Sequence, residues 1–194
     1  MARKRVAILI SGRGSNMAAL IEAAKDPAYP AEVVLVIADR PDAGGLHLAR
    51  GLGIEARAVD AKAIGNRAAF EAQLDAQLNE ARPDIVALAG FMRILSPWFV
   101  GRRRDQLINI HPSLLPEFPG LDTHARALAA GAKRHGCTVH FVREGVDDGP
   151  IIAQAEIAVL PGDTPDTLAE RVLAEEHKLY PRALALVASG KASP

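Results

Sequence analysis

Short apolar runs of strand length alternate with segments of helical pattern along most of this chain. Strand-like runs occupy 5–10, 32–38, 54–59, 85–89 and 107–110, and helical segments occupy 17–25, 43–51, 67–81 and a short stretch from residue 97. Strands and helices that alternate in this way form a parallel, doubly wound sheet. Runs that are apolar at nearly every position are typical of strands buried on both faces. The chain is therefore predicted to fold as an α/β protein with a mainly parallel open sheet, Rossmann-like, and helices on both faces.

The last third of the chain departs from this alternation. After a helix predicted at 123–131, two strand-like runs, 138–142 and 151–158, are separated only by a loop. Strands joined by a short loop pair antiparallel, so we expect an antiparallel addition at the C-terminal end of the sheet. A last helix is predicted from 163–166 to about Ser189, interrupted or kinked near Pro181, because proline lacks the amide hydrogen that a helix needs. All these elements are assigned to one domain, 1–194, without a linker.

Composition and charge exclude several classes of protein. Hydrophobic residues make up 49% of the 194 residues, and Lys plus Arg equal Asp plus Glu at 23 each. A net charge of zero argues against a nucleic-acid or membrane-surface partner, and the basic run 102–104 is interpreted as a solvated helix end. No apolar stretch approaches the length of a membrane span. The single cysteine, Cys137, cannot form an internal disulfide and is predicted to be a small buried side chain. We therefore expect a cytoplasmic protein.

The run 107–110 carries polar residues where an ordinary buried strand would have none. Asn109 lies within it, His111 stands at its end, and Pro112 follows at once. Residues two apart on a strand point to the same face, and open α/β sheets bind ligands at the carboxyl ends of their strands. Either residue alone is more often structural. Together, an amide that donates to an oxyanion and an imidazole that carries a proton suit acyl transfer.

A glycine-rich turn, 11–16, joins the first strand to the first helix. The free N–H groups and the positive dipole at a helix N-terminus attract an anion. The turn lacks the Lys-Ser/Thr of a P-loop, and Met17 stands where the dinucleotide fingerprint needs its third glycine. We therefore predict that Gly14, Ser15 and Asn16 bind a single phosphate; the alternative is a plain β–α turn.

Two other loops are candidates for the site. The segment 90–97 brings large apolar side chains to the sheet edge, which is either ordinary packing or the wall of a pocket for a flat ring system. The loop 143–150 carries Asp147 and Asp148, acids that matter only if one of them reaches His111. The histidines form no His-Glu-x-x-His pattern and a lone cysteine excludes Cys-rich zinc sites, so no metal is expected.

Five motifs, in this order, resemble the folate-dependent formyltransferases. They lie at 11–16, 89–95, 109–116, 139–142 and 147–150, and the likeness extends from about residue 6 to 188. The Asn-x-His-Pro-Ser-Leu-Leu-Pro run that starts at Asn109 marks the wider family. The Gly-Ser-Asn turn that starts at Gly14 narrows the resemblance to the purine-pathway branch, the phosphoribosylglycinamide formyltransferases.

This resemblance implies an enzyme of de novo purine biosynthesis. It would transfer the formyl group of 10-formyltetrahydrofolate, a co-substrate, to the amine of glycinamide ribonucleotide, giving formylglycinamide ribonucleotide and tetrahydrofolate. The catalytic set implied is Asn109, His111 and Asp147. An amide such as Asn109 that donates to the oxyanion is worth on the order of 3–4 kcal/mol, and Asp147 would favour the protonated form of His111.

The resemblance also implies the residues that bind the two substrates. The ribotide would be held by Gly14, Ser15, Asn16 and Glu176. The folate would be held by Arg67, Met92, Arg93, Ile94, Leu95 and Asn109. Two positions depart from the pattern of the relatives. Leu173 stands where some of them have lysine, and Asp148 adds a second acid where a small residue is expected.

Rival functions remain open at this level. A formyltetrahydrofolate hydrolase usually carries an extra N-terminal domain, for which a sheet that begins at about Val6 leaves no room. A methionyl-tRNA formyltransferase needs a C-terminal tRNA-binding domain, whereas this chain stops at Pro194. A non-catalytic nucleotide-binding module would need the glycine turn but not Asn109, His111 and Asp147 together. We therefore expect the purine-pathway activity.

Overall fold

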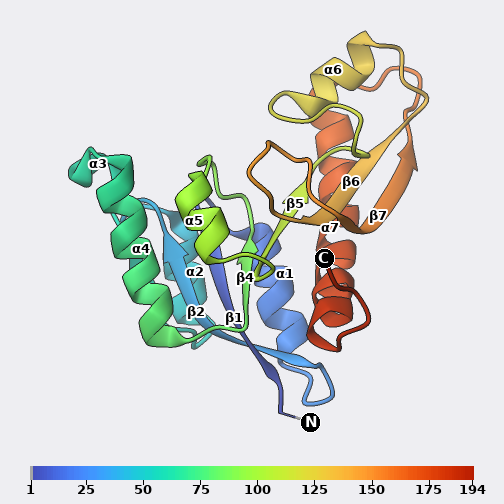
Figure 1. Cartoon of the computed structure of the whole chain (residues 1–194). Coiled ribbons are helices and arrows are strands. Elements are labelled where there is room, and N and C mark those ends of the chain that lie inside the picture. Colours follow the sequence, from blue (N-terminus) through green and yellow to red (C-terminus); the bar gives the residue numbers. More distant parts are fainter. Residues whose placement is uncertain (1) are drawn as a thin grey trace.

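The computed structural model of the protein describes residues 2–194 and contains a seven-stranded sheet of order β3-β2-β1-β4-β5-β6-β7 (Figure 1). The strands are β1 (Lys4–Ile10), β2 (Ala31–Ala38), β3 (Ala56–Ala58), β4 (Ile85–Leu88), β5 (Leu107–His111), β6 (Arg134–Phe141) and β7 (Ile151–Ala158). Strands β1 to β5 are parallel, whereas β6 pairs antiparallel with both β5 and β7. The predicted mixed sheet is confirmed.

Helices cover both faces of this sheet, as predicted. They are α1 (Ser15–Ala24), α2 (Gly44–Gly51), α3 (Ala61–Ile64), α4 (Arg67–Ala81), α5 (Pro97–Arg102), α6 (Thr123–Ala129) and α7 (Pro165–Ala188). Side chains of α1, α2 and α7 share one buried cluster with the sheet, and those of α3, α4 and α5 share the other (Figure 1). The Tyr180 hydroxyl, fully buried on α7, donates to the backbone carbonyls of Leu88 and Ile108 and thereby ties α7 to β4 and β5.

The strand order places a topological switch point beside β1. The chain leaves β1 for β2 and β3 on one side and returns to the other side as β4. The connections that follow β1 and β4 therefore lead to helices on opposite faces of the sheet, and such a point is where open α/β sheets bind ligands. The Ser11 amide donates to the Gly90 carbonyl at 3.1 Å, and the Ser11 hydroxyl oxygen accepts from the Met92 amide at 2.9 Å. These bonds hold the two loops side by side.

Several element boundaries differ from the predictions. Strand β6 begins at Arg134, ahead of the predicted 138–142, and β3 is shorter than the predicted 54–59. Helix α3 was not predicted; the Asp60 carboxylate accepts from the amides of Lys62 and Ala63, each at 3.0 Å, and caps this short turn. Asn66 caps α4, because its side chain accepts from the Ala69 amide at 2.9 Å.

Of the two outcomes predicted near Pro181, an interruption or a kink, the interruption is wrong. Helix α7 is assigned without a break from Pro165 to Ala188. Residues on both sides of the proline, among them Leu179 and Leu184, are buried in the same cluster. Packing of this apolar stripe against the sheet and α1 offsets the loss of one backbone hydrogen bond at the proline.

The basic run 102–104 is only partly a solvated helix end. Arg102 and Arg104 are exposed, but Arg103 is buried and donates from Nε to Asp75 Oδ1 at 2.9 Å. Burial raises the pKa of the Asp75 carboxyl, and the hydrogen bonds from Arg102 and Arg103 outweigh it, so the net pKa is lowered. This pair joins α4 to α5. Cys137 is buried, as predicted, and no helix within residues 2–194 is long and apolar enough to cross a membrane.

Candidate active site

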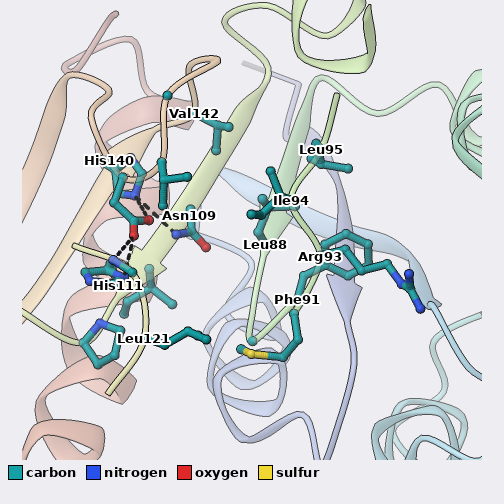
Figure 2. A pocket seen from close by; sticks show the side chains of 18 of the residues that line it. Leu88, Phe91, Arg93, Ile94, Leu95, Asn109, His111, Leu121, His140 and Val142 are labelled. Atoms are coloured by element: carbon teal, nitrogen blue, oxygen red, sulfur yellow. Dashed lines mark hydrogen bonds and ion pairs between the residues drawn. The ribbon is translucent and has the colours of Figure 1, made fainter. Parts of the chain in front are cut away.

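A cavity of about 750 Å³ opens at the carboxyl ends of β4 and β5. Its walls come from three loops: the segment after β4, the segment after β5, and the β6–β7 loop. Figure 2 shows Asn109, His111 and His140 gathered at one end of it, with Leu88, Ile94 and Leu95 across the cavity. The site therefore combines a polar end with an apolar wall.

The pairing of β5 with β6 brings the polar residues together. Asn109 stands directly opposite His140, and His111 stands opposite Thr138. Because side chains alternate along a strand and directly paired residues share a face, Asn109, His111 and His140 all point to the same side of the sheet (Figure 2). The two-residue spacing of Asn109 and His111 in the sequence thus has the predicted consequence.

His111 is buried between two acceptors. Its Nε2 lies 3.0 Å from the Phe118 carbonyl oxygen, and its Nδ1 lies 3.2 Å from Asp147 Oδ2. Carbonyl and carboxylate oxygens only accept hydrogen bonds, so a ring that donates to both must carry a proton on each nitrogen. The contacts of His111 therefore match the imidazolium form, with Asp147 as its counter-charge.

Asp147, and not Asp148, reaches back from the β6–β7 loop to the histidines. Asp148 is exposed, whereas Asp147 also accepts the Gly120 amide at 2.9 Å. Burial raises the pKa of the Asp147 carboxyl, but the neighbouring His140, the Gly120 amide and His111 outweigh burial and hold the pKa below its ordinary value. The carboxylate is thus kept ionised beside His111.

The predicted phosphate residues surround the N-terminus of α1. Gly14 has φ +78° at the N-cap, and a Cβ there would lie 2.9 Å from Met17 Cε. No side chain caps this helix, and its first turn holds no acid. Ser15 is exposed, while Asn16 is buried and has an unpartnered Oδ1. Free amides and an unused acceptor are what a bound phosphorylated ligand would satisfy.

Glu176 of α7 lies beside the N-terminus of α1 and forms a second polar cluster with Asn16. Its Oε2 accepts from Asn16 Nδ2 at 2.6 Å, which links two residues far apart in the sequence. Burial raises the pKa of the Glu176 carboxyl, and the Asn16 hydrogen bond opposes this only in part. Leu173, on the same helix, is half-buried and apolar, so α7 contributes no cation at that position.

The predicted folate residues divide between two hollows. Met92 and Ile94, 71% and 69% exposed, line the main cavity beside the buried Leu95. Arg93 also borders it, but its guanidinium points away from Asn109 (Figure 2) and donates from Nε to Asp39 Oδ2 at 2.6 Å.

Arg67 does not line the main cavity. It stands at the start of α4, with Nε 3.3 Å from Glu71 Oε1, and borders an adjacent hollow of about 640 Å³. That hollow shares the residues 92–95 with the main cavity. Arg67 is therefore brought near the predicted folate wall, on its other side, but not near the catalytic residues.

The profile of the formyl transferase family matches residues 4–184. The chain belongs to the formyl transferase family. The match covers both predicted substrate clusters and every residue of the polar end of the cavity.

Individual members of this family are similar over nearly the whole chain. Phosphoribosylglycinamide formyltransferase of Escherichia coli is 44% identical over 96% of this chain and 88% of its own length. The crystal structure of phosphoribosylglycinamide formyltransferase from Brucella melitensis has a TM-score of 0.92 and 53% identity, covering 96% of each chain. The trifunctional purine biosynthetic protein adenosine-3 of Drosophila melanogaster is 50% identical over 98% of this chain, which spans only 14% of that protein.

Two parts of this formyl transferase site were missed by the sequence predictions. The motif 139–142 contains His140, for which no role is predicted, although its place on β6 opposite Asn109 brings it into the polar cluster. The Phe118 carbonyl, which faces His111, was not predicted at all. The pairing of β6 with β5 would have revealed His140 if the register had been predicted; a backbone carbonyl in a loop leaves no sequence signal.

Proposed function

We propose that this chain is a phosphoribosylglycinamide formyltransferase, which transfers the formyl group of 10-formyltetrahydrofolate to the amine of glycinamide ribonucleotide. The observation that carries the proposal is the contact of Asp147 with His111 at the polar end of the cavity, beside Asn109. The names of similar proteins over nearly the full chain support the choice of substrates.

In the reaction, the ribotide amine attacks the formyl carbon and the carbonyl oxygen becomes an oxyanion. Asn109 donates an N–H to this oxygen, and the His111 imidazolium adds positive charge to the same region. The bond from the formyl carbon to folate N10 then breaks, the attacking nitrogen loses a proton, and N10 gains one. Asp147, 3.2 Å from His111 Nδ1, favours the charged form of His111 while the oxyanion exists.

The apolar wall suits the folate donor. Leu88, Met92, Ile94 and Val142 are among the apolar side chains that line the cavity. A flat heteroaromatic ring that packs on such side chains buries apolar area on binding, and a few polar groups suffice to orient it. The donor's formyl group would then face Asn109 and His111.

The cluster at α1 suits a ligand with one phosphate. The free amides at 15–17 offer one concentrated anion site, and Asn16 with Glu176 would orient the rest of the ribotide through hydrogen bonds. We treat residues 1–194 as one formyltransferase domain, because one sheet runs through it. A reducing compartment such as the cytoplasm suits a chain whose one cysteine is free.

The decisive assay mixes the protein with 10-formyltetrahydrofolate and glycinamide ribonucleotide and follows the release of tetrahydrofolate. Release is expected only when the ribotide is present. No turnover above the protein-free control would refute the proposal, and equal release without the ribotide would indicate a hydrolase instead.

A competition distinguishes a free small acceptor from tRNA. Glycinamide ribonucleotide and methionyl-tRNA are supplied together with donor labelled in the formyl group. Binding of tRNA would neutralise many phosphates, each adding roughly 0.7–0.9 to the salt slope of log affinity, and this chain has a net charge of zero. The label is therefore expected on the ribotide; label mainly on tRNA would overturn the acceptor assignment.

A further inference from the structure

His140 is a buried residue of β6 in direct contact with the proposed oxyanion donor. It stands opposite Asn109 in the register of the two strands, and only 2% of it is exposed. Its Nε2 lies 3.2 Å from Asn109 Nδ2. A buried imidazole in this place can control which way the amide of Asn109 points.

The second ring nitrogen of His140 shows which tautomer is present. Its Nδ1 lies 2.9 Å from the Phe141 carbonyl oxygen. A carbonyl only accepts, so Nδ1 carries the hydrogen, and Nε2 of the neutral ring has a lone pair and accepts. Asp147 Oδ1, at 3.6 Å from Nε2, is another acceptor and lies beyond hydrogen-bond distance. Of the two groups that face Nε2, the NH2 group of Asn109 is the nearer, at 3.2 Å, and the neutral ring accepts from it; a protonated Nε2 would instead donate to Asp147.

This contact fixes the orientation of the Asn109 amide. An amide turned by half a rotation would place Oδ1 against Nε2, so that two acceptors would face each other. Within residues 2–194, the Asn109 side chain makes no other hydrogen bond. One of its two N–H groups is used by His140, and the second, on the same nitrogen, makes no hydrogen bond within residues 2–194; Asn109 is partly exposed and lines the cavity.

We propose that His140 is a positioning residue, which holds the Asn109 amide with an N–H directed at the formyl oxygen of the donor. The proposal rests on the proposed function. A donor that is oriented before reaction costs no reorganisation when the oxyanion forms. Without the Nε2 acceptor, the amide turns freely and can present its own oxygen to the developing negative charge. Because that charge exists only in the transition state, the loss falls on kcat and not on KM.

Three single variants test the role. His140→Ala is expected to lower kcat about tenfold with little change in KM, the size of one lost orienting hydrogen bond. His140→Gln keeps a side-chain acceptor near the position of Nε2 and should recover part of kcat. Val139→Ala is the matched control. Val139 is the buried neighbour of His140 on β6, and its side chain packs in the cluster shared with α1, α2 and α7. This variant should lower stability and leave kcat unchanged. An equal loss of kcat in Val139→Ala would overturn the proposal.

A double-mutant cycle asks whether His140 acts through Asn109. The variant with both Asn109→Ala and His140→Ala should have the kcat of Asn109→Ala within about twofold, because the amide to be oriented is already absent. Effects that multiply would show an independent role and would refute the proposal. A second cycle pairs His140→Ala with Asp147→Asn. If the effects on kcat are non-additive in that cycle and additive in the cycle with Asn109→Ala, His140 acts through Asp147 and the proposal is refuted.

Nitrogen NMR of the His140 ring provides a readout that does not depend on activity. In the folded wild-type protein, Nδ1 is expected to be protonated and Nε2 unprotonated, with the His140 signals identified by their absence from His140→Gln. A protonated Nε2 would overturn the proposal even if the enzyme is active. Failure of the proposed function would appear differently, as wild-type protein that releases no tetrahydrofolate.

Discussion

The two polar clusters at the edge of the sheet are built in opposite ways. At the end of β5, Asn109, His111, His140 and Asp147 bond to one another and to backbone groups, so most of their polar atoms are already paired. At the start of α1, by contrast, backbone amides have no capping side chain and the buried Asn16 Oδ1 has no partner.

This difference suggests that the cluster at the end of β5 serves catalysis and the cluster at the start of α1 serves ligand binding. A cluster that is paired before the substrate arrives is preorganised, and it stabilises the transition state with the few groups that remain directed at the cavity. A cluster with unsatisfied groups gains when a ligand satisfies them, and it contributes to affinity. Substitutions in the first cluster should therefore lower kcat, and those in the second should raise the KM for the ribotide.

The largest effect is expected for Asn109→Ala in the catalytic cluster. Loss of an oxyanion-hole amide lowers kcat by about 10²–10³, and the KM values for both substrates should change little. Steady-state kinetics with each substrate varied in turn would measure this. A variant that raised KM and kept kcat would break the distinction between the clusters, because Asn109 would then act as a binding residue.

A smaller loss, about tenfold in kcat, is expected for Asp147→Asn. A neutral amide at this position no longer balances the charge of a protonated His111, whose Nδ1 lies 3.2 Å from Asp147 Oδ2. NMR titration of His111 in both proteins would measure the coupling. Asp148→Asn is the matched control, since Asp148 is the exposed neighbour in the same loop. An unchanged titration of His111 in Asp147→Asn would refute the role of this carboxylate.

The fold and the catalytic strand were predictable from local patterns. Buried runs and helical periodicity gave the mixed sheet, and the spacing of Asn109 and His111 gave a shared face at the sheet edge. Features that depend on partners distant in the chain were not predictable. Arg103 looked like part of a solvated run, and only the approach of α4 with Asp75 makes it a buried ion pair. The same holds for the continuity of α7 across Pro181, which depends on tertiary packing.

The choice between Asp147 and Asp148 shows which part of the site local sequence patterns could not predict. Both acids lie in one loop, and local sequence patterns do not tell which reaches His111; Asp147 was predicted only through the resemblance to the formyltransferases. The backbone at Asp147 has φ 54°, a left-handed conformation that directs the next residue elsewhere. Such a turn is set by the Gly120 amide and the histidines together, so it follows from the tertiary structure and not from local preference.

In the binding cluster, Gly14→Ala should raise the KM for the ribotide about fivefold and change kcat little. The left-handed φ of +78° costs an alanine roughly 1–2 kcal/mol, and its Cβ would press on Met17 and displace the turn. Gly190→Ala is the matched control, because Gly190 has a φ of +70° with nothing near its Cβ. The control should lose comparable stability without a change in KM. Equal KM changes in both variants would show that stability, and not the turn, decides binding.

The dephosphorylated acceptor tests the same cluster from the ligand's side. Its affinity, measured by calorimetry, should fall about tenfold below that of glycinamide ribonucleotide, because the free amides of α1 then lack their anion. In Gly14→Ala the two acceptors should differ less than in the wild type. Equal affinities in the wild type would make the turn structural.

The smallest effect concerns stability, and the two clusters should show opposite signs. The pKa of Asp147 is lowered in the folded protein, so its contribution is present above the ordinary carboxyl pKa of about 4 and is lost as the pH falls through the folded value. The pKa of Glu176 is raised by burial, so its contribution is present below the ordinary pKa and is lost as the pH rises through the folded value.

Urea unfolding of three variants between about pH 3 and pH 8 would measure these contributions. Asp147→Asn should lose stability relative to the wild type as the pH rises, whereas Glu176→Gln should gain. Glu170→Gln, at an exposed position of α7, controls for the loss of one negative charge. Parallel curves for the Asp147 and Glu176 variants would mean that the two carboxyls experience the same environment. The distinction between the preorganised cluster at the end of β5 and the ligand-binding cluster at the start of α1 would then be refuted.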